Sequence, residues 1–126
     1  MELDAFCQRV RDNYPDISSR ADALYDAYWN DLVDTEFSSH SWFESLANAL
    51  NDEMSKRRPI QDYGPLLNAI SQAFECGSDE LKNTIDVAFV ENLFWQVGPN
   101  DSEPFWHILP VNLRALYIAF HGRAPG

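Results

Sequence analysis

The sequence predicts an all-α fold, a single-domain bundle of about six to seven helices packed around a buried helix at residues 79–97. Apolar residues recur mostly at three- and four-residue spacings, which is the period of a helix face, and strict alternation is scarce. The 5 glycines and 7 prolines cluster between these periodic stretches. With 126 residues, 45% of them hydrophobic, the chain can bury one core, so we expect residues 1–126 to form one domain.

The first two helices are separated by a proline. The helix at residues 3–13 should stop at Tyr14, because the residue before Pro15 is pushed out of the α region. A second helix is predicted from about residue 16 into residues 34–37. Its expected buried stripe is Ile17, Ala21, Leu24, Tyr28 and Leu32. The residues expected to face away from this stripe are Asp22, Asp26, Asn30 and Val33, with Trp29 at its edge.

The next two helices have recognisable start and stop signals. A serine within residues 38–41 can cap a third helix, because its oxygen accepts a free backbone N–H of the first turn. Positive charge at residues 56–58 favours the C-terminal end of this helix, and Pro59 prevents continuation. A fourth helix should start near Pro65 and end at Gly77 in a left-handed conformation. The expected buried face of the third helix is Phe43, Leu46, Ala47, Leu50 and Met54.

The fifth helix, at about residues 79–97, is predicted to be the most buried. Its apolar residues cover nearly every direction of a helical wheel, which is typical of a helix enclosed on all sides. A strand at residues 85–90 is the alternative, but the long stretch without Gly or Pro favours a helix. After a loop, a short helix at 105–109 and a last helix at 110–121 complete the chain.

The net negative charge of the chain indicates which classes of partner it can bind. There are 20 acidic residues and 9 Lys or Arg, which gives a formal net charge of −11. Phosphate backbones and anionic lipid surfaces should repel such a chain, so we expect no direct nucleic-acid or membrane partner. A basic protein surface should attract it and raise the encounter rate. The N-terminus has acidic residues where a signal peptide needs Lys or Arg, so we expect a cytoplasmic protein.

The sequence offers little support for catalysis. Glu36 and His40 are four residues apart, but one ligand pair does not complete a metal site, and we expect neither metal nor cofactor. Glu91 lies on the most buried predicted helix, where a carboxylate could serve as an acid or base; a structural bond to Arg114 or to an aromatic hydroxyl is the favoured reading. Cys7 and Cys76 form no CxxC pair, so two free thiols are expected, with a disulfide as the alternative. We therefore predict a protein that is not an enzyme.

The acidic residues are concentrated in the first half of the chain. Residues 12–53 contain ten acids and one base, Arg20. Like charges at this density repel one another, which favours a binding role, although a merely solvated acidic face is the alternative. An aromatic side chain ringed by carboxylates is typical of a hot spot for a basic protein. The predicted partner-binding residues are Asp22, Asp26, Trp29, Val33 and Asp34.

Two segments of the C-terminal half resemble a known family. They are residues 90–95 (VENLFW) and residues 109–117 (LPVNLRALY). In these segments the chain resembles the small acidic α-helical immunity proteins of bacterial polymorphic toxin systems, including contact-dependent inhibition and Rhs-type effectors, over residues 42–125. The resemblance implies an inhibitor that binds a cognate toxin domain, often a basic nuclease. The alternative is an intracellular regulatory or adaptor domain that binds a housekeeping protein.

Overall fold

The prediction of an all-α fold is confirmed. The computed structural model describes residues 2–29, 36–59 and 61–125, and within these ranges every regular element is a helix. The α-helices are α1 (Leu3–Asn13), α2 (Pro15–Trp29), α3 (Ser39–Ser55), α4 (Gly64–Cys76), α5 (Asp79–Thr84), α6 (Pro99–Ile108) and α7 (Val111–His121). A short 3₁₀ turn, η1 (Gln61–Tyr63), precedes α4, and a π-helical segment, η2 (Ile85–Val90), continues α5. No helix among the described residues is both long enough and apolar enough to cross a bilayer.

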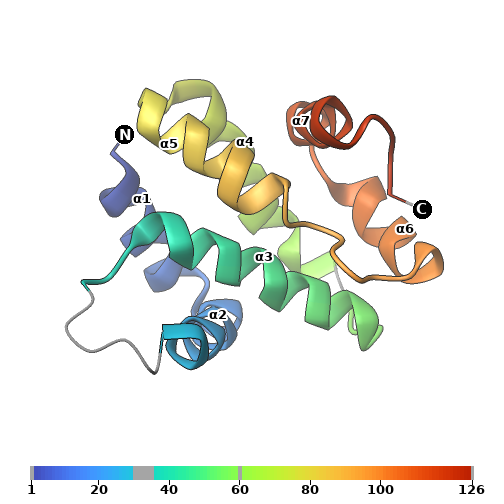
Figure 1. Ribbon diagram of the computed structural model, residues 1–126, viewed down its shortest axis with the longest axis horizontal. Helices are drawn as coiled ribbons and strands as arrows, with labels where there is room; N and C mark the ends of the chain where they lie inside the picture. The colour runs from blue at the N-terminus through green and yellow to red at the C-terminus, as the bar shows by residue number, and fades with distance from the viewer. Residues whose placement is uncertain (1, 30–35, 60, 126) are drawn as a thin grey trace.

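The long helix α3 runs through the middle of the bundle (Figure 1). α1 and α2 lie on one side of it, α4, α5 and η2 lie on the other, and α6 and α7 cover the end nearest the C-terminus. The Phe43 ring of α3 stacks on Phe6 of α1 at 5.9 Å and meets Phe89 of η2 edge-on at 6.5 Å. The predicted buried face of α3 is confirmed, because Phe43, Leu46, Ala47, Leu50 and Met54 are all buried.

The helix predicted at residues 79–97 is buried but shorter than expected, and the prediction that the bundle packs around it was wrong, because α3 occupies the middle. It is α-helical to Thr84 and π-helical to Val90, and the chain then forms a series of turns. One reason for the early end is local: Asn92 donates a side-chain hydrogen bond of 2.7 Å to the Ala88 carbonyl, which competes with helical backbone bonds. The boundary at residue 97 was therefore wrong, while the buried character of residues 81–90 is confirmed for Leu81, Ile85, Ala88, Phe89 and Val90.

The buried face of α2 matches the predicted one in its first half and differs from it in its second half. Leu24 and Tyr28 are 41% and 76% exposed, while Ser18 and Tyr25 are buried. The polar atoms of the buried face are satisfied internally: Ser18 Oγ donates to the Val10 carbonyl at 3.3 Å, and the Tyr25 hydroxyl accepts from the Ser38 backbone N–H at 2.9 Å. Ile17 and Ala21 of the predicted stripe are buried as expected, whereas the prediction was wrong for Leu24 and Tyr28, because apolarity alone does not locate a buried face that contains satisfied polar groups. The last member of the stripe, Leu32, lies outside the described residues, as does most of the predicted extension of α2.

Gly77 and Pro99 have structural roles that differ from the predicted ones. Gly77 is extended, with φ −80° and ψ 173°, and is needed for close approach instead, because a Cβ there would lie 2.5 Å from the Ala73 carbonyl oxygen. α6 starts at Pro99, in the stretch predicted to be a loop, since proline is tolerated at the first helical position. The predicted serine cap of the third helix is confirmed at Ser38, which accepts from Ser41 N at 3.2 Å, and Ser78 caps α5 in the same way by accepting from Leu81 N at 3.2 Å.

Candidate protein-binding surface

The turn that follows η2 has a strained backbone. Phe94 and Gln96 adopt φ angles of 69° and 55°, a region that costs about 1 kcal/mol or more for a residue with a Cβ. The buried Asn51 of α3 holds this turn: its amide nitrogen donates to the Asn92 carbonyl at 2.8 Å, and its amide oxygen accepts from Phe94 N at 2.7 Å. The strain is thus maintained by a side chain from the middle of the bundle.

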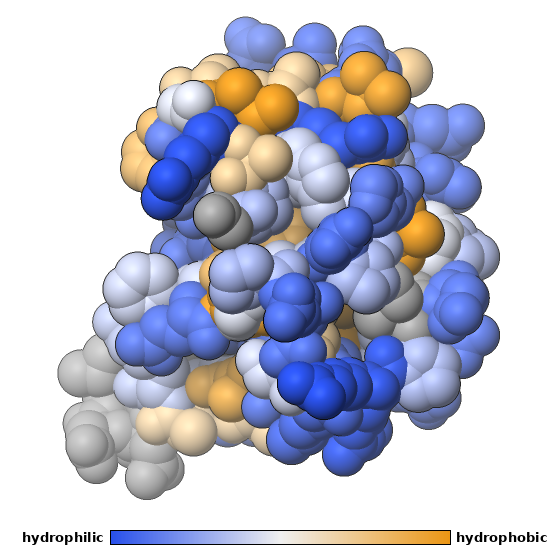
Figure 2. Space-filling model, turned by 90° about the vertical axis from the view of Figure 1, so that its right-hand side faces the viewer, coloured by the Kyte–Doolittle hydropathy of each residue, from blue (hydrophilic) through white to orange (hydrophobic). Residues whose placement is uncertain are grey.

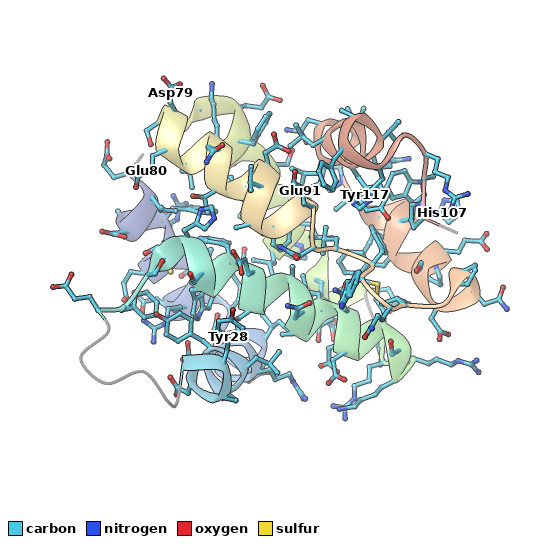
Figure 3. The ribbon with its side chains drawn as sticks, viewed as in Figure 1. Tyr28, Asp79, Glu80, Glu91, His107 and Tyr117 are labelled. Atoms are coloured by element: carbon cyan, nitrogen blue, oxygen red, sulfur yellow. The ribbon has the colours of Figure 1, made fainter. Side chains whose placement is uncertain are left out.

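This turn projects Trp95 away from the core. Trp95 is 65% exposed, whereas the neighbouring Phe94 is buried and packs edge-on against Phe105 at 5.8 Å. Trp95 lines a groove of about 360 Å³ together with Leu24 and Tyr28 of α2. Figure 3 shows Tyr28 at the C-terminal end of α2, beside α3. The α3 residues in the groove are Ser41, Glu44, Ser45 and Asn48.

An acidic pocket lies at the N-terminal end of α3. It has a volume of about 440 Å³ and contains the carboxylates Asp4, Glu36 and Glu80, which come from three separate parts of the chain. The exposed ring of Phe37 also lines it. No Lys or Arg is among the described residues that line this pocket or the groove. The guanidinium of Arg11 lies over the Phe37 ring, 5.1 Å from its centroid, but Arg11 is not among the lining residues. The carboxylates of the pocket therefore favour a cationic group of a partner.

The pocket and the groove are neighbours along α3. His40 lines the pocket, Glu44 lines the groove, and His40 Nε2 lies 3.8 Å from Glu44 Oε1. We call the combined surface the α3 face, made up of the acidic pocket (Asp4, Glu36, Phe37, His40 and Glu80) and the aromatic groove (Leu24, Tyr28, Glu44 and Trp95). It offers carboxylates at one end and large aromatic side chains at the other, a combination suited to a basic protein.

Comparison with known proteins gives a family but no activity. Residues 7–122 match the family model described as a domain of unknown function, DUF7674. The chain belongs to the DUF7674 family. Searches of curated proteins and of solved structures each find no significant match. The matched DUF7674 region contains the aromatic groove completely and all of the acidic pocket except Leu3 and Asp4.

The five predicted binding residues of this DUF7674 chain do not form one described site. Asp26 is exposed, as expected. Trp29 is the last residue of α2, and Val33 and Asp34 lie outside the described residues. The side chain of Trp29 is likewise not described. Asp22 is only partly exposed because it has a structural role, so of the two members whose side chains are described, only Asp26 is fully exposed.

Asp22 connects α2 to its neighbours. Its carboxylate accepts a hydrogen bond of 2.7 Å from the indole N–H of Trp42, a side chain with no exposed surface. The other oxygen lies 3.3 Å from Arg11 of α1. A buried indole N–H needs an acceptor, so this carboxylate is required for the fold, and a charge reversal at this residue would disturb it.

Sequence reasoning missed the aromatic groove. Leu24 and Tyr28 had been assigned to the core, and Trp95 to a helix. The available signal for Trp95 was its position just before Gly98 and Pro99, where a helix must end. The signal for Tyr28 was weaker, because only the polar partners of Tyr25 reveal which tyrosine is buried.

A second polar cluster is structural. Glu53 of α3 is buried; its Oε1 accepts from the Tyr63 hydroxyl at 3.0 Å and lies 3.1 Å from Arg20 Nε. Its Oε2 lies 3.2 Å from Arg58 Nε, in an ion pair whose alignment does not make a hydrogen bond with any described residue. Burial, followed by the bond to Glu53, raises the pKa of Tyr63 to about 12. The cluster joins α2, α3 and η1 and opens into neither part of the α3 face.

Of the residues considered for catalysis, Glu36 and His40 both line the acidic pocket. No three His, Cys, Asp or Glu side chains converge on a metal geometry in the described part of the DUF7674 chain. His40 Nδ1 lies 3.1 Å from Thr84 Oγ1. Figure 3 shows Glu91 beside α7, where its backbone carbonyl lies 3.2 Å from His121 Nε2. Of the two partners predicted for the Glu91 carboxylate, Arg114 is not paired with it among the described ion pairs and hydrogen bonds; Arg114 Nε donates to the Leu109 carbonyl at 2.8 Å.

Both cysteines are free thiols, as predicted. Cys7 is buried in α1, and this burial raises the pKa of its thiol to about 11, so the reactive thiolate is suppressed. Cys76, at the end of α4, is exposed.

Proposed function

We propose that this protein inhibits a basic protein, and specifically that it is a cytoplasmic immunity protein that neutralises a cognate bacterial toxin domain, such as a nuclease, without catalysing a reaction. The observation that carries the proposal is the α3 face, where an exposed Trp95 on a braced turn adjoins carboxylates and no described Lys or Arg lines the surface. The resemblance of residues 90–95 and 109–117 to immunity proteins supports the choice of a toxin as the partner.

In this proposal the acidic residues mainly raise the association rate, and the aromatic residues mainly stabilise the complex. The net charge of −11 attracts a basic surface at long range and raises the association rate. In the complex, the carboxylates of Asp4, Glu36 and Glu80 would occupy positions that a nuclease uses for phosphates. Trp95 and Tyr28 provide apolar contact area with few rotatable bonds, and the bonds from Asn51 fix the Trp95 backbone before binding.

The test is co-expression with the product of the gene immediately upstream, followed by purification of the complex and measurement of its association and dissociation rates. Trp95→Ala should weaken binding by about 30-fold or more through faster dissociation, since truncation of a central aromatic anchor costs about 2 kcal/mol. Glu36→Lys with Glu80→Lys should slow association by about tenfold at low salt.

Matched variants separate these effects from general ones. Phe120→Ala removes an aromatic side chain that is also well exposed, but on α7. Asp62→Lys with Glu103→Lys produces the same change in net charge at exposed residues of η1 and α6. The proposal is wrong if the product of the upstream gene does not bind. That result is expected under the alternative, in which this chain is an adaptor that binds a housekeeping protein. The assignment to the α3 face is wrong if the control variants weaken binding equally.

A further inference from the structure

The last helix exposes an apolar face. Val111 and Ile118 of α7 are 74% and 43% exposed, and Ala115 between them is exposed as well. These residues lie on the side of the helix opposite the buried Leu113 and Tyr117, as their spacing requires. Figure 2 faces the C-terminal side of the molecule and shows hydrophobic side chains gathered at its top, over α7. Exposed apolar residues that share one face of a helix are typical of a protein–protein contact.

The distribution of charge near the exposed face of α7 favours a second copy of this chain as its partner. Residues 104–126 contain Arg114 and Arg123 and no Asp or Glu, in a chain with 20 acids. Carboxylates border α7 at both ends: Asn112 donates to Glu75 of α4 at 2.9 Å, and Glu91 lies beside the C-terminal end, where its carbonyl is 3.2 Å from His121 Nε2. Two copies that each carry a net charge of −11 repel one another, and they repel least where acids are scarcest. The α7 face is therefore where this chain can best approach itself.

The spacing of the face is self-complementary. Val111 and Ile118 are two helical turns apart, and the small side chain of Ala115 lies about midway between them. If two α7 helices cross in antiparallel orientation at Ala115, Val111 of each copy meets Ile118 of the other, which a two-fold axis requires. The alanine allows close approach, and the antiparallel helix dipoles attract.

We propose that α7 forms the interface of a symmetric homodimer, with the antiparallel α7 helices crossing at Ala115. This inference does not depend on the proposed inhibitor function, because the α3 face is formed by other elements. The two surfaces respond to salt with opposite signs. Added salt screens the repulsion between like-charged copies and strengthens the dimer, whereas it weakens the attraction between the α3 face and a basic partner.

Sedimentation velocity over a range of concentrations, at low and high salt, tests the proposal on the purified chain. We expect a reversible dimer that tightens with salt and that Ile118→Asp weakens by at least about tenfold, since a charge would be buried without a partner. Leu24→Asp, at a residue of nearly equal exposure on α2, should leave the dimer unchanged. A monomer at every concentration overturns the proposal, and so does a dimer that Leu24→Asp disrupts.

Cross-linking tests the position of the two-fold axis. In a Cys76→Ser background, Ala115→Cys should form a disulfide-linked dimer on mild oxidation much faster than Ala23→Cys, which introduces an exposed thiol on α2. Equal rates for the two variants would contradict the crossing at Ala115. If the chain stays monomeric while Ile118→Asp reduces binding of the upstream gene product, the face belongs to that partner and the dimer proposal is wrong.

Discussion

Replacement of Gln96 by glycine should stabilise the protein, which is unusual for a substitution to glycine. Gln96 has φ 55° and an exposed side chain. A left-handed conformation costs about 1–2 kcal/mol for a residue with a Cβ, and glycine removes that cost. Glycine also has more conformational freedom in the unfolded chain, which lowers the free energy of unfolding by about 0.5–1 kcal/mol. The net expectation is a stabilisation of about 0.5–1 kcal/mol.

Urea unfolding measures this difference directly. For a slope of about 1.5 kcal/mol/M, the midpoint should rise by roughly 0.3–0.7 M with the slope unchanged. Gln72→Gly is the matched control, because Gln72 is exposed within α4, and there glycine should destabilise the protein by about 1 kcal/mol. If Gln96→Gly lowers the midpoint as Gln72→Gly does, the positive φ is incorrect and the argument for a strained turn fails.

The remaining predictions concern Asn51, Asp22 and the two cysteines. Asn51→Ala should destabilise the protein by about 2–3 kcal/mol in urea unfolding, because the Phe94 N–H is left buried without an acceptor; a loss under 0.5 kcal/mol would show that Asn51 does not hold the turn. Asp22→Ala should cost about 1.5–3 kcal/mol, whereas Asp22→Asn, which keeps an acceptor for the indole, should cost less; equal losses would contradict the role of that bond. Cys7 should react with a thiol reagent only on unfolding, while Cys76 reacts at once. Since burial raises the folded pKa of Cys7 to about 11, its protonated form stabilises the native state at neutral pH, and this contribution should be lost as pH rises towards 11; a Cys7→Ala variant with the same alkaline slope would contradict this.

The sequence was most informative where local signals agreed. α3 has a periodic apolar face, a capping serine at Ser38 and a proline just beyond its end, and its start and buried residues were predicted correctly. α2 has a weaker pattern, because its buried face includes Ser18 and part of Asp22, whose polar atoms find partners on α1 and α3. Such partners are tertiary contacts, and no periodicity in α2 reveals them.

The candidate site was harder to predict for the same reason. An acidic surface next to an exposed aromatic side chain was expected, and the α3 face has both features. The aromatic residues of its groove are Tyr28 and Trp95, and the side chain of the predicted Trp29 is outside the part of the chain that the structure describes. The position of Trp95 depends on a bond from Asn51, more than 40 residues earlier in the chain, and a helical wheel contains no such information.

The dependence of the turn on Asn51 also orders events during folding. Closing a loop between α3 and residues 92–94 costs chain entropy. The two hydrogen bonds of Asn51 can offset this cost only after α3 and η2 have docked. A chain whose helices have formed but not yet packed therefore has no aromatic groove. Trp95 would be a late reporter of folding, and recognition of a partner through it would be confined to the fully native molecule.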